Sequence, residues 1–235
     1  MTKINVLAIA AHPDDAEVSC GGLLIRMGDL GYRTGVLDLT RGEMGSGGTV
    51  EIRAAEAEAA SKIMGLSVRE NANLPDSRLV LDEHSRETVA ASIRRLRPEM
   101  VILPCAGQRH PDHNVAGEIG YAAIFAAGLK KFPIKGTPHR PERILYMTSF
   151  QQHAASFYVD ISEQMERKLQ AVNAYQSQFG DTGSPRNGNK TINSELQNWS
   201  RHFGSLCGVA CAEAYWIKES MLIENPITEL RINSI

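Results

Sequence analysis

Two clusters of histidine and aspartate each follow an apolar run of the sequence. The first, "HPDD", begins at His12 after the run "VLAIAA", and the second, "HPDH", begins at His110 beyond the run "MVILP". Core packing does not call for ionisable groups where a buried strand ends. Two imidazoles and a carboxylate are a ligand set that holds catalytic zinc with one position open for water. If both runs are central strands of one sheet, His12, Asp15 and His113 converge, and we predict a metal site there.

The elements that must position these residues are strands and helices that alternate along the sequence. Apolar runs alternate with segments whose apolar residues recur at helical spacing, which predicts an α/β fold with a mostly parallel sheet flanked by helices. In such sheets ligands bind at the carboxyl ends of the strands. We expect strands over 4–11, 34–40, 100–104 and 143–147, and helices over 17–30, 50–64, 85–96 and 162–175, the last capped by Ser162.

Local sequence around the two clusters refines this expectation. Pro111 disfavours helical geometry at His110 but suits the first turn of a helix, so His113 is expected to open that helix while His110 stays in the loop. No G-x-G-x-x-G motif follows the first strand, and "GEMGSGG" (42–48) lacks the Gly-Lys-Ser/Thr ending of a phosphate-binding loop. A nucleotide-binding interpretation is therefore not favoured.

Composition restricts the class of partner. The 235 residues are read as a single domain, 1–235, and the net charge is −2 without a block of like charge. Neither nucleic acid nor an anionic membrane is expected, and a small molecule fits better. The N-terminal apolar run is too short for a spanning helix and has no cleavage site, so we expect no signal peptide or membrane anchor. Four cysteines without disulfide spacing are typical of thiols in the cytoplasm.

The motifs "AHPDDAE" (11–17) and "RHPDH" (109–113) resemble the two signatures of the LmbE-like (PIG-L) zinc de-N-acetylases. Similarity also runs through "LDLTRGEMGSGGTVEIRAAEA", "NLPD", "PHR" and "AYQSQF", which most resemble the branch that makes bacillithiol from N-acetylglucosaminyl malate. The resemblance implies a Rossmann-like fold, hydrolysis of an amino-sugar amide, and assembly of identical subunits into a hexamer.

The resemblance also implies a role for individual residues. Those that match the family motifs are the metal ligands His12, Asp15 and His113, the general base Asp14, the electrophilic partner His110 and the substrate-contacting Arg53. Ile192 stands near the place where some relatives carry a tyrosine close to the active site.

The chemistry of amide hydrolysis gives each of these groups a task. Zinc lowers the pKa of its bound water to about 7, and Asp14 would take the water proton and pass it to the leaving amine. Adjacent residues of an extended chain point to opposite sides, so Asp15 is expected to face the metal and Asp14 the water. His110 would stabilise the oxyanion best when protonated, and Asp112 could support that form.

Substrate contacts and the metal are less narrowly defined. Arginine binds carboxylates in a bidentate fork, so Arg53, Arg109 and Arg140 are candidates for holding a malate-like aglycone or sugar hydroxyls. Asp76 is a candidate for bonding a sugar hydroxyl or for a turn after Pro75. The ligand set suits Zn²⁺ but also accepts iron(II), cobalt or manganese.

Several alternatives stay open. The conjugate could instead be an inositol glycoside or a chitooligosaccharide. A non-catalytic metal- or sugar-binding protein has no evident need for Asp14 beside the metal, and a glycosidase needs carboxyl groups on opposite sides of its bond, which adjacent Asp14 and Asp15 do not offer. The segment 180–190, "GDTGSPRNGNK", is either a connection or a mobile flap.

Overall fold

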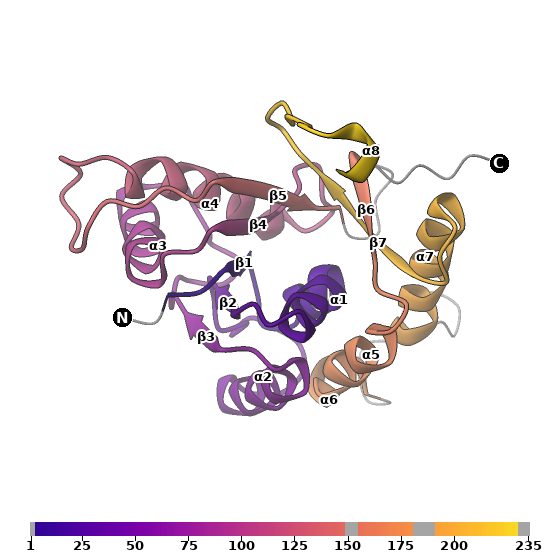
Figure 1. The fold of residues 1–235 in the computed structure, drawn as a ribbon. Coiled ribbons are helices and arrows are strands. Elements are labelled where there is room, and N and C mark those ends of the chain that lie inside the picture. The colour runs from indigo at the N-terminus through magenta and orange to yellow at the C-terminus, as the bar shows by residue number, and fades with distance from the viewer. Residues whose placement is uncertain (1–2, 149–154, 181–190, 230–235) are drawn as a thin grey trace.

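A seven-stranded sheet forms the centre of the computed structural model, which describes residues 3–148, 155–180 and 191–229 (Figure 1). The strand order is β3-β2-β1-β4-β5-β7-β6. The first five strands in this order are parallel, and β7 is antiparallel to both β5 and β6. The strands are β1 (Val6–Ala10), β2 (Thr34–Asp38), β3 (Val68–Asn71), β4 (Met100–Pro104), β5 (Arg143–Met147), β6 (Phe157–Asp160) and β7 (Ala212–Trp216).

Helices connect the parallel strands and cover both faces of the sheet. They are α1 (Asp15–Asp29), α2 (Val50–Met64), α3 (Glu83–Leu96), α4 (Pro111–Ala127), α5 (Met165–Asn173), α6 (Gln176–Phe179), α7 (Ile192–Cys207) and α8 (Pro226–Glu229). None of the helices in these ranges is long and apolar enough to cross a membrane.

The alternation of side chains along β1 divides the core into two layers. Leu7 and Ile9 pack with residues of α3 and α4, whereas Val6, Ala8 and Ala10 pack with residues of α1, α2 and α5. Successive residues of a strand point to opposite faces, so a strand buried on both faces is apolar throughout. Figure 1 shows α3 and α4 on one side of the sheet and α1, α2 and α5 on the other. The expected α/β fold with a mostly parallel sheet flanked by helices is confirmed.

Two details differ from the sequence expectation. The helix expected from Ser162 begins at Met165 after Gln164, and the Ser162 hydroxyl bonds Asp160 instead of capping it. The reason is that residues 161–164 form a turn in which the N–H of Gln164 bonds the carbonyl of Ile161. The second detail is in α1, where Cys20 has a non-helical φ of −138° and breaks the helix into two segments.

Candidate metal centre and catalytic site

The two histidine clusters lie at the carboxyl ends of adjacent central strands. His12 follows β1 and His110 precedes α4 after β4, and β1 pairs directly with β4. The chain continues from β1 to β2 on one side and reaches β4 on the other, so this edge is the topological switch point of the sheet. Crevices at such points are where open α/β sheets bind their ligands.

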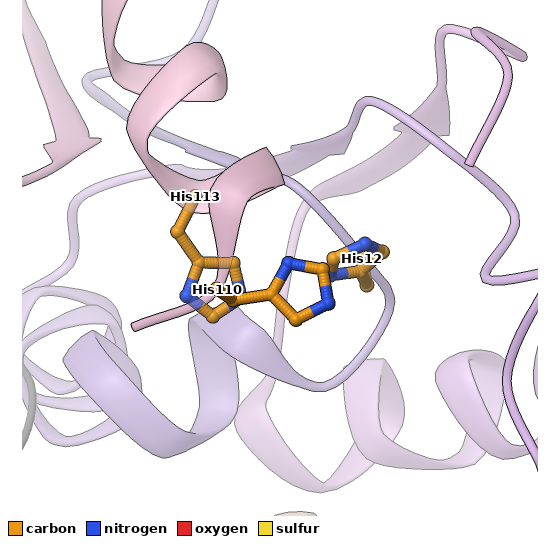
Figure 2. Close-up of side chains that lie close together, drawn as sticks. All are labelled: His12, His110 and His113. Atoms are coloured by element: carbon orange, nitrogen blue, oxygen red, sulfur yellow. The ribbon is translucent and has the colours of Figure 1, made fainter. Parts of the chain in front are cut away.

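Three imidazoles gather at this edge. Figure 2 shows His110 between His12 and His113, with the last two approaching from β1 and from the first turn of α4. The ring centroids of His12 and His110 are 4.8 Å apart, those of His110 and His113 4.9 Å, and those of His12 and His113 5.5 Å. One nitrogen from each ring lies within 4.8 Å of the others, which is close enough for the three to share an ion.

The Asp15 carboxylate lies between two of these rings. Its Oδ2 is 3.3 Å from His12 Nδ1 and its Oδ1 is 3.1 Å from His113 Nε2. The backbone N–H of His12 also donates to Asp15 Oδ2 at 2.9 Å, which fixes the carboxylate at the start of α1. The structure thus brings together the three side chains that the sequence predicts as metal ligands.

The other nitrogen of His12 faces two buried carboxylates. His12 Nε2 is 3.1 Å from Asp76 Oδ1 and 3.3 Å from Asp112 Oδ2. Backbone N–H groups hold both carboxylates, from Met44 to Asp76 Oδ2 and from Ser77 to Asp112 Oδ2. Asp76 is 5% exposed, so it is placed to orient His12 instead of meeting a sugar hydroxyl.

Asp14 adopts a backbone conformation that the sequence does not predict. Its φ is 114°, where a non-glycine residue is strained, and it precedes the first residue of α1. The positive φ, and not an extended chain, is therefore what separates the Asp14 and Asp15 side chains. Arg53 Nη2 donates to Asp14 Oδ2 at 3.0 Å and to the carbonyl of Pro13 at 2.5 Å. Arg53 is 5% exposed, and its guanidinium holds the Asp14 loop.

The two adjacent aspartates have opposite pKa shifts. Burial and the charge of Asp15 raise the pKa of Asp14 to about 8, although Arg53 and His12 act in the other direction. Burial also raises the pKa of Asp15, but the charges and hydrogen bonds of His113 and His12 outweigh it and hold that pKa well below its usual range. Asp15 is thus held as the anion of the pair, whereas the raised pKa of Asp14 is typical of groups that exchange protons at functional sites.

The histidines are affected by the same carboxylates. Burial lowers the pKa of His12, but the hydrogen bond and charge of Asp15 and the charges of Asp76 and Asp14 raise it to about 9. His113 behaves alike, since Asp15 raises its pKa against burial. Carboxylates that attract protons so strongly to two imidazoles attract other cations to the same place.

His110 has a different environment from the one expected. Its Nδ1 accepts the backbone N–H of Asp112 at 3.3 Å, so it is the N-cap of α4. The Asp112 carboxylate points to His12 and not to His110. Burial and the charges of His12 and His113 lower the pKa of His110, against a smaller opposite effect of Asp112. The expectation that Asp112 keeps His110 protonated is therefore wrong for this geometry, and the neutral ring carries its proton on Nε2.

The two remaining arginine candidates lie in different places. Arg109 is exposed beside His110, at the edge of the sheet where the three histidines lie. Arg140 precedes β5, and its guanidinium lies 5.0 Å from the ring of Phe125 and donates to the Phe125 carbonyl near the end of α4. The helix α4 begins beside the histidines and runs to the opposite edge of the sheet, so Arg140, which contacts its far end, lies away from the histidines. The structure therefore does not bring Arg140 together with the predicted metal ligands.

Sequence reasoning missed one residue that contacts the site. Gln108 precedes His110 by two positions, and its Oε1 lies 2.8 Å from His113 Nδ1. Its place within "GQRHPDH" was the available signal. Ile192 is the first residue of α7 and is buried, and residues 181–190 of the predicted loop lie outside the described residues.

The donor set fits a divalent first-row ion. Asp15 faces both His12 Nδ1 and His113 Nε2, and the second nitrogen of each histidine meets an oxygen of Asp76, Asp112 or Gln108. Metal-binding histidines in proteins regularly have such an outer contact, which fixes the tautomer and orientation of the ring. The residues present therefore suit zinc or a related ion.

Comparison with known proteins agrees with this geometry. Residues 7–124 match the family described as PIG-L, GlcNAc-PI de-N-acetylase. The chain is 34% identical over 189 residues to the diacetylchitobiose deacetylase of Thermococcus kodakarensis, covering 74% of this chain and 70% of that one. It is 27% identical over 172 residues to the 1D-myo-inositol 2-acetamido-2-deoxy-alpha-D-glucopyranoside deacetylase of Rhodococcus jostii, and this match covers 59% of each protein, less than two thirds of that relative's length.

A solved structure extends the likeness over nearly the whole fold. The conserved protein TT1542 from Thermus thermophilus has a TM-score of 0.87 and 40% identity, over 94% of this chain and 97% of that one. The matched family segment contains both histidine clusters, β1 and β4. Two adjacent central strands present these clusters, and the family match covers half of the chain. This chain therefore belongs to the PIG-L family of de-N-acetylases.

Proposed function

We propose that this protein is a metal-dependent hydrolase that removes the acetyl group from the amine of an N-acetylglucosamine conjugate. Family membership and relatives support deacetylation of such substrates. The observation that carries the mechanism is the pairing of Asp15, which faces His12 and His113, with Asp14, which faces Arg53. A site built only to hold a metal has no evident use for the second carboxylate.

His12, Asp15 and His113 would hold the ion. When bound, a zinc ion polarises the acetyl carbonyl and lowers the pKa of water. The other steps belong to side chains of this chain. Asp112 and Asp76 orient His12, and Arg53 holds Asp14 in place.

Asp14 serves as the proton carrier. As a carboxylate it removes a proton from the attacking water, and as the acid it then delivers this proton to the nitrogen of the leaving amine. A catalytic group works best when its pKa lies near the working pH. The environment that raises the pKa of Asp14 to about 8 supports this double role.

His110 serves as a hydrogen-bond donor to the developing oxyanion. Because its Nδ1 accepts the N–H of Asp112, the neutral ring has an Nε2–H available to donate. Removal of one such donor typically costs 10²- to 10³-fold in rate.

For the substrate we propose N-acetylglucosaminyl malate, with diacetylchitobiose as the second candidate. The malate conjugate is supported by the sequence motifs of the bacillithiol branch and by Arg109, an exposed cation beside His110 that suits a carboxylate. Diacetylchitobiose is supported by the 34% identity to the Thermococcus enzyme.

The Asp14→Asn variant tests the mechanism. Asparagine keeps the size of the side chain but cannot take up a proton, so acetate release is expected to fall by about 10²- to 10⁴-fold while zinc binding persists. Acetate release would be measured on N-acetylglucosaminyl malate, diacetylchitobiose and N-acetylglucosaminyl inositol. Asp29→Asn, at the exposed end of α1, is the matched control and should retain the wild-type rate.

The outcomes separate the alternatives. Faster Asp14-dependent release from the malate conjugate supports the first candidate, and preference for diacetylchitobiose replaces it with the second. Zinc binding without acetate release from any of the three would refute the deacetylase proposal and favour a non-catalytic binding protein.

We also propose that the protein acts as a homo-oligomer, a hexamer, in the cytoplasm. Resemblance to the bacillithiol branch supports the hexamer, and four cysteines without disulfide spacing suit a reducing compartment. Light scattering of the purified protein would give its mass in solution.

A further inference from the structure

The loop between β4 and α4 places one neutral side chain against a predicted metal ligand. Gln108 is half-buried, and its amide spans from the end of β4 to the first turn of α4. Its Oε1 lies 2.8 Å from His113 Nδ1, and its Nε2 donates to the carbonyl of Cys105 at 3.1 Å.

The contact with Cys105 determines which way the amide points. A backbone carbonyl can only accept a hydrogen bond, so the amide group that faces Cys105 must be the NH₂. The oxygen of Gln108 then faces His113, and it can only accept. His113 must therefore carry a proton on Nδ1, and Nε2, which lies 3.1 Å from Asp15, is the nitrogen left to bind a metal.

The backbone of Gln108 is fixed as well. Its N–H donates to Asn114 Oδ1 at 2.8 Å, and Asn114 Nδ2 donates to the carbonyl of Gln108 at 2.8 Å and to that of His110 at 3.3 Å. Asn114 lies in the first turn of α4, next to His113. The loop and the helix are therefore joined by reciprocal bonds, which fix the backbone from which the Gln108 side chain reaches His113.

We propose that Gln108 is a positioning residue that holds His113 in the Nδ1–H tautomer, so that Nε2 is free to bind the metal. This assignment rests on the proposed function, because it takes His113 as a metal ligand. The two histidine ligands are then held differently. Carboxylates of Asp76 and Asp112 face His12, whereas an uncharged amide oxygen faces His113.

Zinc affinity of the metal-depleted protein, measured by competition with a chelating dye, tests the assignment. Gln108→Met keeps the length of the side chain but offers no comparable acceptor, and we expect about 10- to 100-fold weaker binding, as when other outer contacts of metal ligands are removed. Gln108→Glu restores an acceptor for Nδ1–H and should bind zinc at least as tightly as the wild type. Gln170→Met, on the exposed side of α5, is the matched control and should leave the affinity unchanged.

A long-range ¹⁵N–¹H spectrum of the zinc-loaded wild type reads the tautomer directly. The expected signature of His113 is a protonated Nδ1 and an unprotonated Nε2, and the Nδ1–H signal should broaden in Gln108→Met as exchange with water quickens. The opposite tautomer in the wild type would overturn the assignment even if no variant folds. Unchanged affinity of Gln108→Met, or a loss in Gln108→Glu equal to that in Gln108→Met, would overturn it too.

Acetate release separates this inference from the proposed function. An active wild type whose zinc affinity does not depend on Gln108 refutes only the positioning role. A protein that shows the expected affinities and tautomer but releases no acetate refutes only the deacetylase proposal.

Discussion

Asp14 and Asp15 are neighbours in the chain, yet the pKa values of their carboxylates shift in opposite directions. Two imidazoles face Asp15 and keep it ionised, whereas Asp14 is buried beside a like charge, and its protonation is opposed by the Arg53 guanidinium and by His12. Pairs of carboxylates whose pKa values are driven apart in this way are typical of acid–base sites.

The pH profile of an Arg53→Met variant tests this division of roles. Arg53 lowers the pKa of Asp14, so its removal raises that pKa further. Asp14 acts as a base only when ionised, and the acid limb of kcat/KM should therefore move to higher pH. Each unit of upward shift lowers the ionised fraction about tenfold on that limb. We expect a larger loss of activity at pH 6 than at pH 9.

Arg140→Met is the matched control for this experiment, because Arg140 packs on Phe125 away from the histidines. Its pH profile should coincide with that of the wild type. A uniform rise of KM at every pH in Arg53→Met would mean that Arg53 binds substrate and does not tune Asp14.

At this scale the sequence predicted which side chains come together better than it predicted their surroundings. His12 and Asp15 stand in one short motif, and His113 follows a strand that pairs with β1. The contact of Asp76 with His12 spans 64 positions, so no local sequence pattern predicts it. The role expected for Asp112 failed because the first turn of α4 turns its carboxylate toward His12 and its N–H toward His110.

Among the elements, α4 comes unusually close to the strand before it. A Cβ placed on Gly117 would lie 2.5 Å from the carbonyl oxygen of Pro104 in β4, and one on Gly120 would lie 2.4 Å from a side-chain carbon of Leu103. Since α4 begins with the turn that bears His113, this close approach helps to set the position of the histidine.

Gly117→Ala should destabilise the protein because the backbone of β4 cannot give way. We expect a loss of about 1–3 kcal/mol in the free energy of unfolding in urea, the usual cost of an added methyl group in a packed core. Gly28→Ala in α1 is the matched control, since a Cβ there meets no atom within 4 Å. It should stabilise the protein by up to about 1 kcal/mol, because alanine reduces the conformational entropy of the unfolded chain. Equal effects of both substitutions would contradict the argument from packing.

The sequence predicted some elements closely and others not at all. α2, β4 and β5 have the expected bounds, because each is a clear apolar run or helical pattern. β3 was not predicted, because its sequence "VREN" has a single apolar residue. This composition suits an edge strand whose residues are half-buried. β7 was not predicted either, because Glu213 interrupts its apolar run, although this glutamate is buried.

On the scale of the whole molecule, Glu213 of β7 joins two elements that are far apart in the sequence, β7 and α1. Its carboxylate accepts the N–H groups of Gly22 and Leu23 at 2.8 Å each, just beyond the break of α1 at Cys20. Lys168 Nζ of α5 donates to the same carboxylate at 2.7 Å. Glu213 therefore caps the second segment of α1 from within the sheet, where an anion suits the start of a helix.

Removal of Glu213 should affect the entire fold. Glu213→Ala leaves the buried ammonium group of Lys168 and two N–H groups without their acceptor, and we expect a loss of about 3–5 kcal/mol in the free energy of unfolding. Glu58→Ala, which removes an exposed ion pair with Lys62 on α2, should leave the free energy of unfolding nearly unchanged. Similar small losses in both variants would mean that the buried pair contributes no more than a surface one.

The mostly parallel sheet was predictable because most of its βα units, β3 excepted, have their own local signal. The antiparallel strands β6 and β7 were not, since pairing between distant segments depends on contacts such as that of Glu213 with α1.

The positive φ of Asp14 has a consequence for how such a sequence evolves. A non-glycine residue in that conformation costs on the order of 1–3 kcal/mol, and glycine would relieve the cost while removing the carboxylate. The backbone alone would therefore favour glycine at position 14, although Arg53 would then lose the carboxylate that it bonds. Under the proposed function, the aspartate is kept because turnover needs its carboxylate, and the strained backbone at this position is the structural cost of that chemistry.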